Sequence, residues 1–116
     1  MHARAPASLV LLLLAACAPA SREAYVADAA LGVCDALDAC GRIGEDQPHD
    51  DLDDCTHDWE DLFDVAWPAS ACQAEDIDRA DYDECLSDAR TWACENDLAN
   101  FADAVEACRP ARVCGD

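Results

Sequence analysis

The chain has 116 residues and a formal charge of −19 at pH 7, because 26 acidic residues face only seven arginines and no lysine. That charge argues against nucleic acids and anionic lipid head groups as partners, since both are negative. The length suits a single domain.

The first sixteen residues have the pattern of an export signal. Arg4 precedes the apolar run Leu9–Ala16, which is far too short to span a bilayer. Residues 14–17 (Leu-Ala-Ala-Cys) resemble the lipobox of bacterial lipoproteins at all four positions. We therefore expect residues 1–16 to be a signal peptide and Cys17 to receive the diacylglyceryl and palmitate groups. An ordinary secretory signal with a chance cysteine is the alternative.

The segment after Cys17 bears on location. Ala18 stands where an aspartate would retain a lipoprotein at the inner membrane, so resemblance to this sorting rule favours the outer membrane. Residues 17–21 comprise the lipidated cysteine and a short tether, which extends to at most ~15 Å. Residues 22–116 form the cysteine-rich domain. We expect a protein of the cell envelope that is held on the bilayer through Cys17.

The mature chain, residues 17–116, has a thin core for its charge. It keeps all 26 acidic residues and six of the arginines, a formal charge of −20. Only 20 of its residues are Val, Ile, Leu, Phe, Trp or Tyr. Like-charge repulsion opposes folding of such a chain, so covalent cross-links are expected.

Two helices are predicted in the first half of the domain. Residues Glu23–Cys40 have apolar side chains at steps of three and four, with Ser21 as a candidate N-cap and Gly41 as a stop. A second helix is predicted from near Asp50 to Trp67, where Pro68 follows. Its apolar stripe comprises Leu52, Cys55, Trp59, Leu62, Phe63 and Ala66.

Two more helices are predicted in the second half. One runs from its N-cap Asp78 to Thr91, and the other from Asp97 to Cys108, where Pro110 stops it. The side chains expected to face inward are Tyr82, Cys85, Leu86, Ala89 and Trp92 on the first, and Leu98, Phe101, Val105 and Cys108 on the second. No strand pattern is present. The sequence therefore predicts an all-α fold, a compact bundle of about four helices cross-linked by four disulfides.

Eight cysteines remain once Cys17 is lipidated, an even number. They are Cys34, Cys40, Cys55, Cys72, Cys85, Cys94, Cys108 and Cys114. No C-x-x-C or C-x-x-x-C pair occurs among them, whereas zinc, iron–sulfur and redox sites usually use such short pairs. Four disulfides are favoured over a metal site, and an exported chain suits them.

Helix geometry limits the pairing of these cysteines. Cys34 and Cys40 lie on one predicted helix with diverging side chains, so they cannot bond to each other. Cys40 with Cys55 would close the first helical hairpin, and Cys85 with Cys108 would cross-link the second. The other four cysteines remain unassigned.

Residues 49–61 are strongly acidic and contain two histidines. On a helix, five of these side chains share one face at three- and four-residue steps and could hold a divalent cation. They are Asp50, Asp53, Asp54, His57 and Asp61. The residue order of a calcium-binding loop is absent, and a solvated acidic face is the alternative.

Groups suited to catalysis are few. The mature chain has two histidines and at most three serines, with no G-x-S-x-G motif and no phosphate-binding glycine loop. We expect no enzymatic activity, no catalytic residue and no cofactor. Trp59, Trp67 and Trp92 are interpreted as core anchors rather than platforms for a ligand.

Short motifs are spread over the mature chain. They are the lipobox ending at Cys17, Cys40-Gly41-Arg42-Ile43-Gly44, Trp67-Pro68 before Cys72, Tyr82 three residues before Cys85, and Val113-Cys114-Gly115. In this layout the chain resembles small eight-cysteine bacterial lipoproteins of uncharacterised function, sometimes labelled natural product biosynthesis lipoproteins. The resemblance implies a similar anchored domain and supplies no catalytic residues.

These features predict a membrane-anchored, extracytoplasmic, non-enzymatic interaction domain. It would present an acidic helical face to a cationic protein or a basic small molecule. The second hypothesis is a divalent-cation-binding lipoprotein that uses residues 49–61. An enzyme of unfamiliar type is the third.

Overall fold

The structure, a computed structural model, describes residues 19–115, so the predicted signal peptide and Cys17 lie outside the described part. The elements are α2 (Arg22–Ala39), α3 (Leu52–Ala66), the short 3-10 helix η1 (Ala74–Asp76), α4 (Arg79–Glu95), α5 (Leu98–Ala107) and α6 (Pro110–Val113). Residues 19–115 contain no strand. The predicted all-α bundle of four long helices is confirmed.

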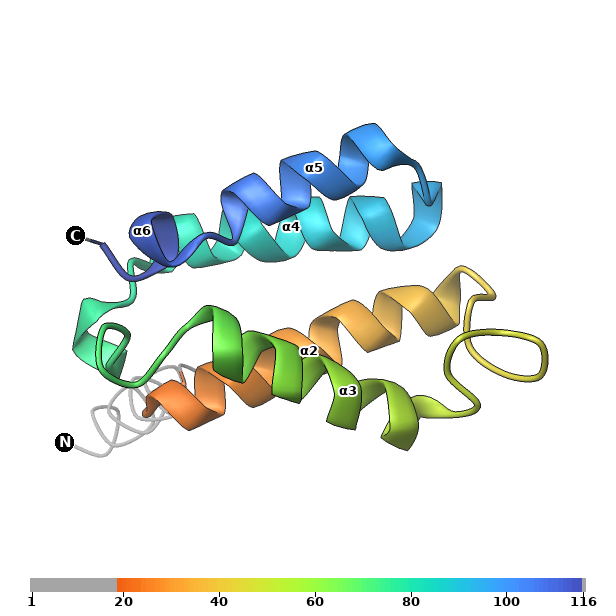
Figure 1. The fold of residues 1–116 in the computed structure, drawn as a ribbon, viewed down its shortest axis with the longest axis horizontal. Coiled ribbons are helices and arrows are strands. Elements are labelled where there is room, and N and C mark those ends of the chain that lie inside the picture. Colours follow the sequence, from red (N-terminus) through yellow and green to blue (C-terminus); the bar gives the residue numbers. More distant parts are fainter. Residues whose placement is uncertain (1–18, 116) are drawn as a thin grey trace, which may run out of the picture.

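The four long helices form two antiparallel hairpins (Figure 1). α2 packs along α3, and α4 packs along α5. The two hairpins meet where α2 packs against α4. Within the described residues, α3 does not pack extensively against α5. The bundle is therefore closed between α2 and α4 and open between α3 and α5.

Each long helix begins with the same local device, a side-chain oxygen that accepts a hydrogen bond from the backbone N–H three residues later. The N-caps are Ser21, Asp51, Asp78 and Asp97, with donor–acceptor distances of 3.1, 2.8, 3.0 and 2.7 Å. The predictions for Ser21 and Asp78 are confirmed. The second helix begins later than predicted, because Asp51 is its cap and Asp50 lies before the helix.

The ends of the helices follow from their terminal residues. Gly41 follows the end of α2 with a φ of +72°, a conformation that glycine adopts without a steric penalty, as predicted for a helix stop. Pro110 was expected to stop the last helix, but α5 already ends at Ala107. Pro110 instead begins α6, because a first helical position needs no N–H donor.

Four disulfides cross-link the described residues, and three of them join the four long helices or their ends to one another. They join Cys34 to Cys55, Cys40 to Cys94, Cys72 to Cys114 and Cys85 to Cys108. The predicted bond between Cys85 and Cys108 is confirmed. The predicted bond between Cys40 and Cys55 is wrong. The loop over residues 41–50 carries α3 back along α2, so that Cys55 lies beside Cys34, about 9 Å before Cys40 on the helix.

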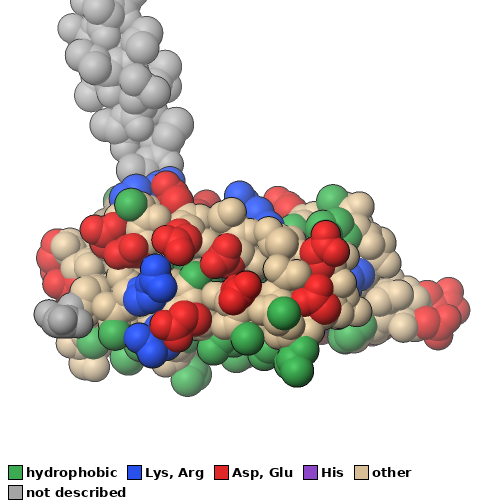
Figure 2. Space-filling model, turned by 90° about the horizontal axis from the view of Figure 1, so that it is seen from above, with side chains coloured by type: hydrophobic (Ala, Val, Ile, Leu, Met, Phe, Trp, Pro, Cys, Tyr) green, Lys and Arg blue, Asp and Glu red, His purple; other side chains and the backbone are tan. Residues whose placement is uncertain are grey.

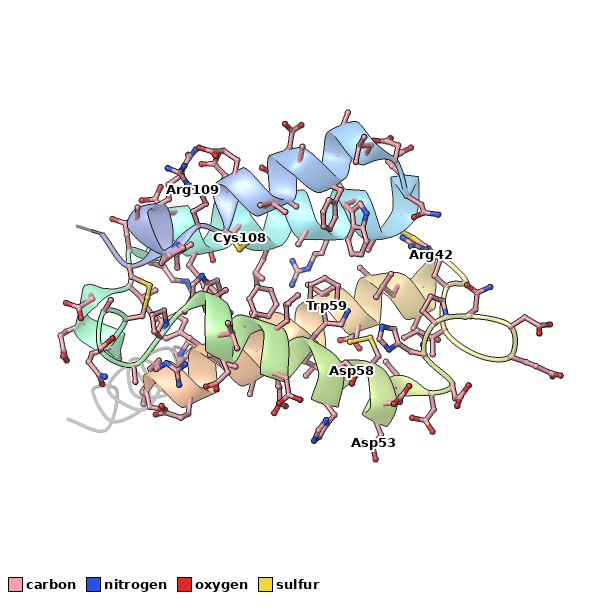
Figure 3. All side chains as sticks on the ribbon, viewed as in Figure 1. Arg42, Asp53, Asp58, Trp59, Cys108 and Arg109 are labelled. Atoms are coloured by element: carbon pink, nitrogen blue, oxygen red, sulfur yellow. A yellow bond between two sulfur atoms is a disulfide. The ribbon has the colours of Figure 1, made fainter. Side chains whose placement is uncertain are left out.

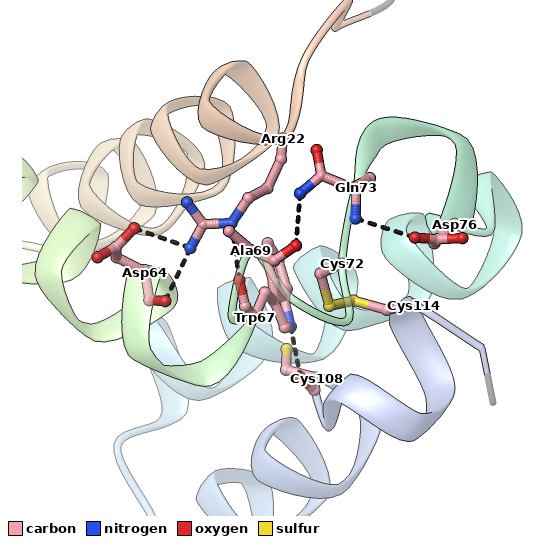
Figure 4. The surroundings of a disulfide bond; sticks show 9 residues. All are labelled: Arg22, Asp64, Trp67, Ala69, Cys72, Gln73, Asp76, Cys108 and Cys114. Atoms are coloured by element: carbon pink, nitrogen blue, oxygen red, sulfur yellow. Dashed lines mark hydrogen bonds and ion pairs between the residues drawn. A yellow bond between two sulfur atoms is a disulfide. The ribbon is translucent and has the colours of Figure 1, made fainter.

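Trp67 is the centre of the core. Its ring lies 4.7 Å from that of Phe63 and 5.9 Å from that of Tyr82, between ring centroids. Its indole Nε1 donates a hydrogen bond to the Cys108 carbonyl oxygen at 2.8 Å, which links the end of α3 to the end of α5 (Figure 4). The indole is fully buried, so its interpretation as a core anchor is confirmed.

Candidate functional site

An apolar groove lies between the two hairpins, with a volume of about 280 Å³. One wall comes from α3 and the other from α5, and α4 forms the floor. The lining residues are Trp59, Leu62, Phe63, Ala66, Ala89, Trp92, Phe101, Ala104, Val105 and Cys108. Figure 3 shows Trp59 projecting from α3 toward the α4–α5 hairpin. It also shows Cys108, a lining residue of the groove, at the end of α5. We call this feature the α3–α5 groove.

The rim of the α3–α5 groove is exposed to solvent. Leu62 is 54 % exposed and Val105 is 52 % exposed, although both were expected to face the core. Leu98, with 82 % exposure, is likewise turned to solvent. Leu52 and Phe101 are also exposed, which corrects their predicted inward placement. The reason is that α3 packs extensively only along α2, and α5 only along α4, so part of each apolar stripe remains uncovered.

Two tryptophans line the groove and also pack against the core. Trp59 and Trp92 are partly buried, and their ring centroids lie 5.6 Å apart. Trp92 also packs against Phe101 at 5.5 Å, in an edge-to-face arrangement. Both pack against the buried core, as expected of core anchors, but each also presents part of its ring to the groove.

Exposed apolar side chains concentrate on α3 and α5. Seven large apolar residues are exposed over the described chain: Leu31, Leu52, Leu62, Val65, Leu98, Phe101 and Val105. All but Leu31 belong to α3 or α5. Figure 2 shows apolar side chains gathered along the lower edge of the molecule, below a face covered by acidic side chains. In this view the apolar side chains along that edge therefore lie apart from most of the acidic ones.

One acidic side chain adjoins the groove on α3. Asp58 precedes the wall residue Leu62 by four residues, so the two are neighbours on the helix surface. Asp61 instead borders a separate hollow next to Arg22 and Val26. Both carboxylates are exposed. Arg42 lies near the groove with its guanidinium 5.1 Å from the centroid of the Trp92 ring. It donates a hydrogen bond to the Ala93 carbonyl oxygen at 2.7 Å and so caps the end of α4.

A second cluster lies where the loop before α3 meets the helix. His49 Nδ1 is 3.2 Å from an Asp58 carboxylate oxygen and 3.8 Å from one of Asp54. The three candidate ligand atoms lie within 4.8 Å of one another. The His49 Nδ1 atom is buried and has no hydrogen bond of good geometry. A histidine nitrogen with two carboxylate oxygens is a ligand set that divalent metals accept.

The structure separates most of the residues predicted to bind a cation. Asp50 lies outside the helix, and its N–H donates to Asp54 at 3.3 Å. Asp53 points away from the bundle (Figure 3). His57 and Asp61 form a separate exposed pair, with 3.7 Å between Nδ1 and the carboxylate. Of the predicted set, only Asp54 belongs to the cluster with His49, and cation binding by the other four stays a prediction.

The sequence did not predict the α3–α5 groove or the cluster of His49 with Asp54 and Asp58, for physical reasons. His49 and Asp58 are separated by the boundary between a loop and a helix, so no helical period relates them. The groove was missed because periodicity identifies an apolar face without saying what covers it. The one available signal was the stripe on α3, which includes Leu62, a groove residue that is 54 % exposed.

Comparisons with known proteins give one result. No curated protein matches the chain, and no solved structure matches it. No helix within residues 19–115 is both long enough and apolar enough to cross a membrane. A sequence model of a family of unknown function, DUF6184, matches residues 34–116, well over half of the chain. The protein therefore belongs to this small, cysteine-rich family of unknown function.

Proposed function

We propose that the mature chain is a lipid-anchored, non-enzymatic binding domain that receives an apolar surface in the α3–α5 groove. The observation on which this rests is the groove itself, with exposed walls of large apolar residues. Contiguous exposed apolar surface is uncommon on a soluble monomer and usually has a function in binding.

The cross-links support a preformed site. Cys34–Cys55 holds α3 on α2, and Cys85–Cys108 holds α5 on α4. Cys40–Cys94 then joins the end of α2 to the end of α4, on the closed side of the bundle. The α5 wall is thus fixed to the α4 floor directly, and the α3 wall is fixed to it through α2. A rigid groove loses little conformational entropy when it is filled, which favours binding.

The proposed location follows from the export signal and the disulfides. Four disulfides fit an oxidising, extracytoplasmic compartment. The domain begins at Arg22, only five residues after Cys17, so an acyl anchor on Cys17 would hold it close to the bilayer. We assign the protein to the cell envelope, with the outer membrane favoured by Ala18.

The neutral dye Nile red tests whether the groove takes up apolar groups. The protein is the full chain with Cys17→Ser, exported and oxidised, so that no acyl group competes. We expect the dye to bind, and Val105→Asp or Leu62→Asp to weaken binding at least about tenfold. Leu31→Asp is the matched control, because Leu31 is 49 % exposed but lies on α2, outside the groove. Equal effects of Leu31→Asp and Val105→Asp would refute the proposed binding site.

A second candidate function is divalent-cation binding, which is favoured by the convergence of His49, Asp54 and Asp58. Micromolar zinc, nickel or calcium would then raise the melting temperature saturably. Asp58→Asn with His49→Ala would abolish that rise, whereas His57→Ala with Asp53→Ala would not. A response no larger than that to sodium chloride at matched ionic strength would remove this candidate.

A further inference from the structure

We propose that the α3–α5 groove binds the apolar face of a cationic amphipathic helix from a partner protein. This inference rests on the binding groove proposed above and names its occupant. The shape of the groove and the charge around it support it independently.

The shape favours a helix over a small molecule. The lining of each wall extends over about two helical turns, from Trp59 to Ala66 on α3 and from Phe101 to Cys108 on α5. The volume of about 280 Å³ lies just below the usual range for drug-sized ligands, roughly 300–1,000 Å³. It suits a few large apolar side chains presented at three- and four-residue steps, as in helix-in-groove recognition.

The position of the groove in the bundle agrees with this shape. The α2–α4 side of the bundle is packed, whereas α3 and α5 leave the opposite side open. A helix lying between α3 and α5 would pack on both walls and on Trp92 at the floor. It would also cover part of the exposed surface of Leu62 and Val105, which no described residue covers.

The negative charge of the chain favours a cationic helix as the partner. The mature chain has a formal charge of −20, and Asp58 lies beside the wall residue Leu62, one helical turn before it on α3. A second copy of the chain has the same net charge, so like-charge repulsion opposes its docking. Anionic lipids and fatty acids are disfavoured for the same reason. A helix with Lys or Arg along its polar edges would gain both attraction and a higher association rate.

The test uses three labelled 18-residue peptides and fluorescence anisotropy with the oxidised Cys17→Ser chain. The first peptide has leucines on one helical face and lysines on the other. In the second, glutamates replace the lysines, and the third has the composition of the first in scrambled order. We expect the first to bind with a roughly micromolar Kd and the other two to bind at least about tenfold more weakly.

Matched variants locate the binding. Val105→Asp should weaken binding of the cationic peptide at least about tenfold, with Leu31→Asp as its control. Asp58→Asn should weaken binding and reduce its dependence on salt. The control is Asp35→Asn, because Asp35 is also exposed but lies on α2, outside the groove. Circular dichroism and the melting temperature verify that each variant is folded.

The outcomes separate the two proposals. If Val105→Asp abolishes Nile red binding but the lysine and glutamate peptides bind alike, the helix inference is wrong and the binding groove stands. If neither dye nor peptide responds to Val105→Asp, both proposals are wrong. If sedimentation shows a dimer that Val105→Asp converts to a monomer, a second copy occupies the groove and the inference is overturned.

Discussion

Arg22 Nε donates a hydrogen bond to the carbonyl oxygen of Trp67 at 2.8 Å, although 45 residues separate them (Figure 4). Arg22 Nη2 also donates to the carbonyl oxygen of Asp64 at 2.8 Å and lies 2.8 Å from the Asp64 carboxylate. The α3 helix has no basic residue in its last turn. Arg22, from the first turn of α2, therefore satisfies the free carbonyls at the end of α3 and offsets the negative end of its dipole.

Replacing Arg22 should destabilise the fold. Only 6 % of the Arg22 side chain is exposed. Burial opposes its charge, but hydrogen bonds to Asp64 and Glu23 outweigh this and hold the pKa of Arg22 above its ordinary value. We expect Arg22→Ala to lower the free energy of unfolding by about 2–3 kcal/mol, measured by urea denaturation of the oxidised protein. Arg112→Ala, which removes an exposed pair with Glu84, should cost less than about 1 kcal/mol. Equal losses would contradict the capping role.

Tyr82 should make the protein sensitive to alkali. Burial, and then the hydrogen bond that its hydroxyl donates to the negative Asp28, raise the pKa of Tyr82 above its ordinary value of 10.0. A raised pKa means that the folded state keeps the proton that the unfolded state loses. The stabilisation is complete below pH 10 and decreases above it, by about 1.4 kcal/mol per pH unit. Urea denaturation at pH 8, 10 and 11 measures this slope.

Tyr82→Phe is the control for that slope. It retains the ring that packs edge-on against Tyr25, at 4.8 Å between centroids, and removes only the titrating hydroxyl. The variant should be less stable at pH 8 by about 1 kcal/mol, because the hydrogen bond is lost. Its stability should decrease less steeply between pH 10 and 11. An unchanged slope would mean that other groups cause the alkaline loss.

The disulfides should differ in their importance for stability. In the chain-entropy estimate, Cys40–Cys94 contributes about 4 kcal/mol and Cys34–Cys55 about 3, because the former closes the longer loop. Cys34 and Cys55 are fully buried, however, whereas Cys40 and Cys94 are exposed. Buried serine hydroxyls without partners cost about 1–3 kcal/mol each, which exceeds the difference in loop entropy.

We therefore expect replacement of Cys34 and Cys55 by serine to destabilise the fold more than replacement of Cys40 and Cys94. Urea denaturation of the exported variants measures both. Alanine at Cys34 and Cys55 should restore part of the loss, because it buries no hydroxyl. Peptide mapping of the exported wild type should find the four disulfides described and no free thiol. A Cys40–Cys55 linkage would contradict this pairing.

Cys17→Ser should release the protein from membranes, or leave it unprocessed at its precursor mass. Fractionation of cells followed by mass spectrometry distinguishes these results. Ala18→Asp should leave the protein lipidated but move it to the inner membrane, which tests the sorting rule separately. Membrane association of a processed Cys17→Ser chain would refute lipid anchoring at this residue.

Added salt should stabilise the domain. Residues 17–116 combine 26 acidic residues with six arginines, so screening by sodium chloride weakens repulsion in the folded state. Differential scanning calorimetry should show a rising melting temperature, by about 4–8 °C for each kcal/mol gained. Under the proposed binding function, calcium at matched ionic strength should add nothing beyond nonspecific screening. A melting temperature that falls with salt would show that attraction between opposite charges outweighs like-charge repulsion in the folded domain.

Local chemistry allowed much of the secondary structure to be predicted from the sequence. An N-cap is a contact between a side chain and a backbone group three residues later, so Ser21 and Asp78 could be identified from neighbouring residues alone. The helical period likewise identified the buried face of α2, including Val26, Val33 and Leu37. The pair Cys85–Cys108 was predictable because two short-linked antiparallel helices fix which residues lie opposite each other.

Features that depend on how the hairpins are placed in space were decided only by the tertiary structure. The course of residues 41–50 sets whether Cys55 lies beside Cys34 or Cys40, and nothing local specifies that course. The period of α5 shows that Leu98, Phe101 and Val105 share a face, but whether a neighbour covers it depends on the distance between α5 and α3. Because the hairpins meet through α2 and α4, that face stays open and becomes the wall of a groove.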